Sequence, residues 1–214
     1  MPISKDREYR NMTIRALTDN EIEESEKRIV TGYASTFDEP YVLFEDDEFM
    51  FQEVVDRNAF DDCDMSDVIM QYDHQGRVFA RISNNTLEVA PDERGLLINA
   101  DLGGTELGRE LYDEIRGGYT DKMSFGFTVR DSDYLYSKTE DGRYLTVRTI
   151  KSIRKLYDVS AVSIPANDGT SISVRNLVDG EIAKIRAERL EAERIETERR
   201  RAIVTAQAMS GGKN

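Results

Sequence analysis

Short runs of β-branched and aromatic residues recur along the first three quarters of the chain, and this composition is typical of strands. The clearest are residues 28–37, Arg-Ile-Val-Thr-Gly-Tyr-Ala-Ser-Thr-Phe, and the alternating residues 51–55, Phe-Gln-Glu-Val-Val. The run at 68–72 ends at Asp73-His74-Gln75-Gly76, where the glycine favours a turn, so His74 is expected at the exit of a strand. Further strands are predicted at residues 86–90, 95–102, 122–129, 143–153 and 156–164.

Only one helix is expected among these strands. Leu107, Leu111 and Ile115 are spaced four apart, Thr105 can cap the start, and residues 117–118 are both glycine. About seven short strands with a single internal helix lack the regular helix–strand alternation that a parallel sheet needs. The pattern therefore predicts an α+β, mainly β protein with an antiparallel or mixed barrel.

The character of the chain changes after residue 176. From Leu177 onward it consists mainly of Glu, Arg, Ala and Ile, which predicts a helix over residues 178–208. Its apolar positions follow a thin heptad seam in which alanines replace leucines, so two interpretations stay open: a solvated helix held by Glu–Arg pairs, or a helix that binds a partner. The predicted organisation is a flexible N-terminal segment (1–27), a folded domain (28–176) and a charged helical C-terminal extension (177–214).

The formal net charge of −13 argues against binding of nucleic acid, which requires clustered Lys and Arg. The single cysteine, Cys63, excludes an internal disulfide, and with one histidine it also excludes a four-ligand Cys/His zinc site. The acidic neighbours of Cys63 disfavour its thiolate, so it is a poor candidate nucleophile. No apolar run is long enough to span a membrane and no signal peptide begins the chain, so a soluble, intracellular protein is expected.

Several familiar site motifs are missing. Gly103-Gly104 lacks the spacing and the lysine of a phosphate loop, and no acidic run has the alternation of a calcium loop. Ser124 is preceded at position 122 by Lys, so the Gly-x-Ser-x-Gly elbow of α/β-hydrolases is absent too. No metal and no cofactor are therefore expected.

Three residues are candidates for acid–base and nucleophilic chemistry, and each also has a structural interpretation. His74 is the only histidine and so the only side chain that titrates near neutral pH without perturbation, although it could simply occupy a turn. Ser124 could be a small polar residue on the outer face of a strand. Asp158 interrupts an apolar strand, where it either faces water or is buried against a partner such as a histidine N–H.

Five segments, in this order, resemble the phage prohead (capsid maturation) protease family of HK97-type capsid systems. The first two are residues 30–37 and 53–60, and the others are Tyr72-Asp73-His74, residues 123–127 (Met-Ser-Phe-Gly-Phe) and residues 158–167, which end in Pro-Ala-Asn. The similarity covers roughly residues 28–175.

The resemblance implies a serine endopeptidase in which Ser124 is the nucleophile, His74 the base and Asp158 the residue that orients the imidazole. The family commonly has glutamate at the third position, where this chain has the shorter Asp158. Asp73 is the alternative orienting residue, but a neighbour of His74 on a strand would point to the opposite face. The sequence does not identify the oxyanion donors: backbone N–H groups near residues 165–167 and a water held by an arginine are both compatible with it.

The resemblance also implies an assemblin-like β-barrel with flanking helices, as in the herpesvirus enzymes, and with it a homodimer. The implied substrates are scaffold, or the scaffolding segment of the major capsid protein, inside the immature shell (the prohead) in the host cytoplasm, and the protease itself. The C-terminal helix would then tether the protease to scaffold. Two other classes remain: a catalytically inactive, scaffold-like structural protein of capsid assembly, and an unrelated β-barrel binding module.

Overall fold

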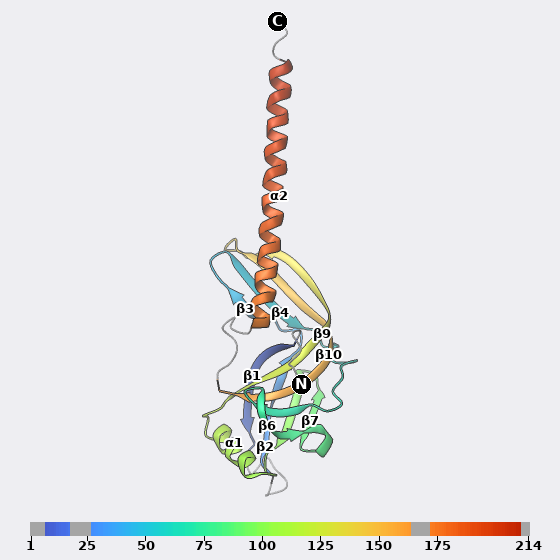
Figure 1. Ribbon diagram of the computed structural model, residues 1–214, viewed down its shortest axis with the longest axis vertical. Coiled ribbons are helices and arrows are strands. Elements are labelled where there is room, and N and C mark those ends of the chain that lie inside the picture. The colour runs from blue at the N-terminus through green and yellow to red at the C-terminus, as the bar shows by residue number, and fades with distance from the viewer. Residues whose placement is uncertain (1–6, 18–26, 164–171, 211–214) are drawn as a thin grey trace. The chain divides into compact units, whose positions relative to one another are not determined.

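The computed structural model describes residues 7–17, 27–163 and 172–210, and within these it describes the side chains except those of Asn11 and residues 172–176 and 204–210. The chain divides into two compact units, Met1–Arg175 and Asn176–Asn214. The first unit contains all ten strands and one α-helix (Figure 1). The strands are β1 (Glu8–Ala16), β2 (Ile29–Thr36), β3 (Tyr41–Glu45), β4 (Phe49–Val55), β5 (Ile69–Tyr72), β6 (Gln75–Arg81), β7 (Leu87–Pro91), β8 (Gly95–Asp101), β9 (Lys122–Lys138) and β10 (Tyr144–Val162).

These strands form one mixed sheet in the order β3-β4-β10-β9-β1-β2-β8-β7, and β5 adds to β10 and carries β6. The prediction of a mainly β protein is confirmed. The predicted barrel is wrong for the described strands, because their pairing path begins at β3 and ends at β7, so the sheet is open. Counting short strands could not show this, since closure depends on which strands pair rather than on how many there are.

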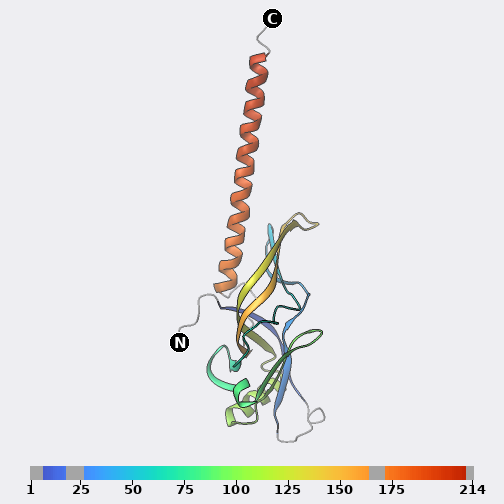
Figure 2. The same ribbon diagram turned by 90° about the vertical axis from the view of Figure 1, so that its right-hand side faces the viewer.

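Two of the strands are much longer than the sequence predicts. Residues 130–138 extend β9 beyond its apolar part, and β10 is continuous where two strands, 143–153 and 156–164, were expected. The two strands pair as a long, curved antiparallel ribbon with several register shifts (Figure 2). Because of its length, β10 has room for two parallel partners on its other edge, β4 beside residues 144–150 and β5 beside residues 158–161.

The N-terminal segment also differs from the prediction. A flexible segment is predicted up to residue 27, but Glu8–Ala16 forms β1, which lies between β9 and β2 inside the sheet. The run is polar, and it becomes a strand because both of its edges have partners: Glu8 to Thr13 pair with β9 and Ile14 to Ala16 pair with β2. Residues 8–16 therefore belong to the folded domain.

The internal helix is confirmed as α1 (Glu106–Arg116). The hydroxyl of Thr105 accepts a hydrogen bond from the N–H of Gly108, as an N-cap does. Leu111 and Ile115 are buried as expected, whereas Leu107 is exposed, and Tyr112 takes its place in the core. A turn later the chain enters β9, so α1 leads directly to the strand that carries Ser124.

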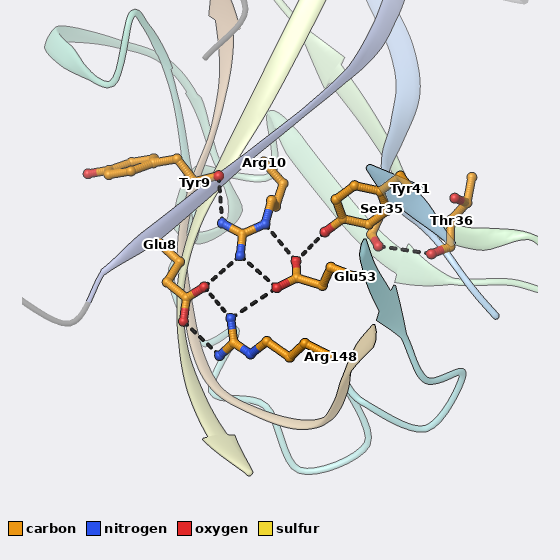
Figure 3. Close-up of polar contacts among 8 residues, drawn as sticks. All are labelled: Glu8, Tyr9, Arg10, Ser35, Thr36, Tyr41, Glu53 and Arg148. Atoms are coloured by element: carbon orange, nitrogen blue, oxygen red, sulfur yellow. Dashed lines mark hydrogen bonds and ion pairs between the residues drawn. The ribbon is translucent and has the colours of Figure 1, made fainter. Parts of the chain in front are cut away.

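A cluster of buried charges ties β1, β4 and β10 together (Figure 3). The Arg10 guanidinium donates to both carboxylate oxygens of Glu53, at 2.6 and 2.7 Å, and to Glu8 at 2.6 Å. Arg148 donates to the same two carboxylates at 2.7 to 2.9 Å, and the Tyr41 hydroxyl donates to Glu53. Two positive and two negative side chains thus neutralise one another at the centre of the sheet, which is how buried charges are tolerated.

The second unit is a helix, α2 (Ile172–Ser210), which begins earlier than the sequence predicts. Its large apolar residues from Leu190 onward are exposed where they are described, including Ile195 and Ile203. Arg189 pairs with Glu193 and Arg200 with Glu196 along one turn of the helix. These contacts favour the interpretation of a solvated helix held by Glu–Arg pairs.

Candidate active site

His74 lies in the tight turn between β5 and β6. Tyr72 pairs with Gln75, which leaves Asp73 and His74 as a two-residue loop, and both have positive φ angles, 48° and 58°. Two positive φ angles are what a type I′ hairpin turn requires. Aspartate and histidine are among the few non-glycine residues that adopt this region with some frequency. The turn therefore begins at Asp73, earlier than the glycine at position 76 suggests.

Asp73 fastens this turn to the end of β10. Its backbone N–H donates to the carbonyl of Ala161 at 2.9 Å, and its carboxylate accepts from the N–H and the hydroxyl of Ser163, both at 2.9 Å. Asp73 thus binds Ser163, and the carboxylate that contacts the imidazole belongs to Asp158. Of the two candidate orienting residues, the structure brings Asp158 to His74.

Asp158 is fully buried and receives contacts on both carboxylate oxygens. His74 Nδ1 lies 2.5 Å from Oδ1, and the Ser160 hydroxyl donates to the same oxygen at 2.7 Å. Arg7 forms an ion pair with Oδ2. The interpretation that Asp158 faces water is wrong, because the side chain is 0% exposed. Burial of a carboxylate is tolerated only with partners of this kind.

Ser124 is on the same face of the sheet as Asp158. It lies directly opposite Ser160 on the neighbouring strand β10, and Asp158 lies opposite Gly126. Residues two apart on a strand share a face, so Ser124, Ser160 and Asp158 point to the same side. Ser124 is 1% exposed, so the interpretation of an outer-face serine is wrong.

Strand β1 contributes the residues that surround the imidazole. Tyr9 lies opposite Gly126, and its ring centroid is 4.2 Å from that of His74. This contact places His74 above the face that carries Ser124. The neighbouring residue Arg10 points to the other face, into the buried charge cluster, and Figure 3 shows the Tyr9 ring directed away from it.

The surroundings of His74 keep the imidazole neutral. Burial, and secondarily the positive charge of Arg7, lower the pKa of His74 to about 4, while the negative charge of Asp73 acts in the opposite direction. A neutral imidazole has one N–H and one lone pair. With Nδ1 facing a carboxylate, the N–H belongs on Nδ1, which leaves Nε2 as the proton acceptor.

Other candidate chemistry is weaker. Burial raises the pKa of the Cys63 thiol to about 11, in agreement with the expectation that it is a poor nucleophile. Among the described side chains no group of three or more His, Cys, Asp or Glu is placed to hold a metal ion. No helix in the described ranges is both long and apolar enough to cross a membrane. Residues 165–167, one of the two candidate sources of oxyanion donors, lie outside the described residues.

Three residues of this site are not found by the sequence argument: Arg7, Tyr9 and Ser160. Ser160 carries a usable signal, because it lies two positions after Asp158 and must share its face. Arg7 and Tyr9 carry none, since they lie in a polar segment whose pairing with β9 depends on residues far along the chain.

Comparison with known proteins identifies the family of the chain. The model of the caudovirus prohead serine protease family (Peptidase_S78) matches residues 15–184, which is more than half of the chain. The chain belongs to this family. The resemblance seen in the ordered sequence segments is thereby confirmed, and the matched region contains His74, Ser124 and Asp158.

Individual proteins have low sequence identity to this chain. The prohead protease of Enterobacteria phage HK97 is 31% identical over 93 residues, which are 43% of this chain. The match spans 38% of the length of that relative. Among solved structures, the bacteriophage T4 capsid assembly protease gp21 matches with a TM-score of 0.41 and 9% identity, over 73% of this chain and 97% of the other.

Proposed function

We propose that the chain is a serine endopeptidase of capsid maturation, in which Ser124, His74 and Asp158 act together. The observation that carries the proposal is the 2.5 Å contact between His74 Nδ1 and Asp158 Oδ1, above the face of the sheet that holds Ser124. Membership of the prohead serine protease family supports the same assignment. An imidazole held by a carboxylate on one nitrogen is the usual base for a serine nucleophile.

The proposed reaction is peptide hydrolysis through an acyl-enzyme. Nε2 of His74 accepts the proton of the Ser124 hydroxyl as Oγ attacks the scissile carbonyl carbon, and the imidazolium then donates that proton to the leaving amine. Water attacks the ester in the second half of the reaction, again losing its proton to Nε2, and the acid product leaves. Asp158 holds the Nδ1–H tautomer and stabilises the imidazolium while it exists.

The proposed substrates are scaffold, or the scaffolding segment of the major capsid protein, and the protease itself. Cleavage would take place inside the prohead, in the host cytoplasm. The prohead protease of phage HK97, to which part of the chain is similar, is the named precedent. A homodimer is a further part of this proposal.

The test is intact mass over time for wild type, Ser124→Ala and Ser160→Ala, each alone and mixed with the capsid or scaffold protein. The two serines lie opposite each other and are equally buried, at 1% and 0% exposed, so each variant controls for the other. We expect discrete fragments from wild type and Ser160→Ala but none from Ser124→Ala. No fragments from any of the three, with assembled capsid protein present, would instead identify a catalytically inactive, scaffold-like structural protein.

We also propose that α2 tethers the protease to scaffold during assembly. The described part of α2 is highly charged and largely exposed, as a segment available to a partner should be. A chain that ends at Arg175 should then enter proheads less efficiently than the full chain. Undiminished incorporation would exclude the tether without bearing on the catalytic proposal.

A further inference from the structure

Arg7 lies beside Asp158 although 151 residues separate them in the chain. Its guanidinium pairs with Oδ2 of Asp158 and lies over the ring of Tyr157, with 4.4 Å from the guanidinium carbon to the ring centroid. The same group lies 5.4 Å from the centroid of the Tyr9 ring. The Arg7 side chain is 15% exposed. An arginine held between two aromatic faces and a buried carboxylate has a defined position rather than a solvated one.

We propose that Arg7 is a positioning residue for the proposed catalytic group: by binding Oδ2 of Asp158 it holds Oδ1 toward His74. The proposal rests on the serine peptidase function proposed above. It adds a fourth side chain, from the residue before β1, to the three that the sequence indicates.

The two oxygens of Asp158 have separate tasks in this arrangement. Oδ1 receives the imidazole at 2.5 Å and the Ser160 hydroxyl at 2.7 Å, so the hydrogen-bonding capacity of this oxygen is used on the side of His74. Without Arg7, Oδ2 would be buried with neither a hydrogen-bond donor nor a positive charge beside it. The carboxylate could then rotate about its Cβ–Cγ bond toward another donor. A guanidinium on Oδ2 prevents that rotation and neutralises the charge.

Gly126 provides the space for this contact. A Cβ atom at position 126 would lie 2.7 Å from Asp158 Oδ2 and 2.7 Å from Arg7 Nε, closer than real Cβ contacts allow. Any larger residue would therefore displace the guanidinium or the carboxylate. The glycine two positions after Ser124 is thus explained by the Arg7–Asp158 pair, which gives an independent observation that the pair is built into the site.

The charges around His74 come from three elements. Arg7 precedes β1, Asp158 is on β10, and Asp73 belongs to the turn of His74 itself, while Tyr9 on β1 contributes an uncharged ring. Arg7 disfavours protonation of the imidazole and Asp73 favours it. Removal of the Arg7 charge leaves the carboxylates of Asp158 and Asp73 unopposed, so the pKa of His74 should rise.

A titration of the imidazole by NMR tests this, because His74 is the only histidine and its signals need no assignment. The parent is Ser124→Ala, which cannot degrade itself, and the comparison is with Arg7→Gln added to it. We expect the titration midpoint to move upward by about one to three pH units, the usual effect of a nearby charge. Arg57→Gln is the matched control, since Arg57 pairs with Asp38 in an exposed position, and it should leave the midpoint unchanged. An unchanged midpoint in folded Arg7→Gln would overturn the proposal.

Gly126→Ala is the second variant, and it decides the question if Arg7→Gln does not fold. The methyl group separates the guanidinium from Oδ2 while all charges remain. Oδ1 is then no longer held toward His74, so Gly126→Ala in the Ser124-containing protein should lower kcat with little change in KM, and a folded variant with wild-type kcat would contradict the proposal. In the Ser124-containing protein, Arg7→Gln should lower kcat with little change in KM, because Arg7 acts through Asp158 rather than on the substrate. The titration does not depend on cleavage, so wild type that never cleaves would overturn the peptidase assignment alone.

Discussion

His74 Nδ1 lies 2.5 Å from Asp158 Oδ1, although the two residues are 84 positions apart in the chain. The contact is made by a hairpin turn with two positive φ angles on one side and a fully buried strand residue on the other. Both partners are therefore held by backbone structure, and the carboxylate is held by two further side chains.

The first prediction separates the two aspartates near His74. Asp158→Asn removes the charge that holds the Nδ1–H tautomer, and we expect kcat to fall by up to about 10⁴-fold. Asp73→Asn changes the group that accepts from Ser163, so its effect on kcat should be much smaller. The measurement is cleavage of a peptide that spans a site identified by intact mass. Equal losses in the two variants would contradict the assignment of Asp158.

The second prediction concerns pH. Because the pKa of His74 is lowered to about 4, the imidazole stays neutral and can accept a proton at any pH above that value. The acid limb of kcat/KM, which reports the free enzyme, should therefore lie near pH 4 rather than near the ordinary histidine value of about 6.5. Circular dichroism at each pH controls for unfolding. A limb near pH 6.5 in a folded protein would show that burial and Arg7 do not keep the imidazole neutral.

Ser160 gives the third prediction. Its hydroxyl donates to Asp158 Oδ1 at 2.7 Å, beside His74, and Ser160→Ala removes one hydrogen bond to a buried carboxylate. Such a bond contributes about 1.5 kcal/mol or somewhat more, so kcat should fall roughly tenfold while cleavage persists. Complete loss of cleavage would instead make Ser160 a competing nucleophile.

The fourth prediction concerns stability. Glu53 is fully buried and accepts from Arg10, Arg148 and Tyr41. Glu53→Gln leaves two buried guanidinium groups with one carboxylate, and we expect the free energy of unfolding to fall by about 3–5 kcal/mol. Glu140→Gln, the same substitution at an exposed position, should change it by less than about 0.5 kcal/mol. Urea unfolding followed by circular dichroism measures the free energy of unfolding of both variants. Similar values for the two would mean that the charge cluster contributes little to stability.

Much of the site follows from local sequence. An aspartate in the apolar run 156–162 had to be either solvated or paired, and a histidine N–H was one of the partners that could accompany it when buried. The structure contains that contact. The helix before the Ser124 strand was equally predictable, because capping and four-residue spacing are properties of neighbouring residues.

What the sequence did not predict depends on pairing between distant segments. The polar residues of β1 and the end of β9 have no apolar alternation, and they are strands because neighbours complete their hydrogen-bond ladders. The open path of the sheet and the arrival of Arg7 at Asp158 depend on the same long-range pairing. Local propensity cannot show such contacts.

Because β1 pairs with β9, the proposed site can form only after most of the first unit has been synthesised. Arg7 and Asp158 are 151 positions apart, so they are synthesised roughly eight to thirty seconds apart at ordinary elongation rates. Until β9 and β10 have emerged, β1 has no strand to join on that edge, and His74 has no carboxylate. Under the proposed mechanism, a chain that ends before β10 lacks the carboxylate partner of His74 and should not cleave its neighbours.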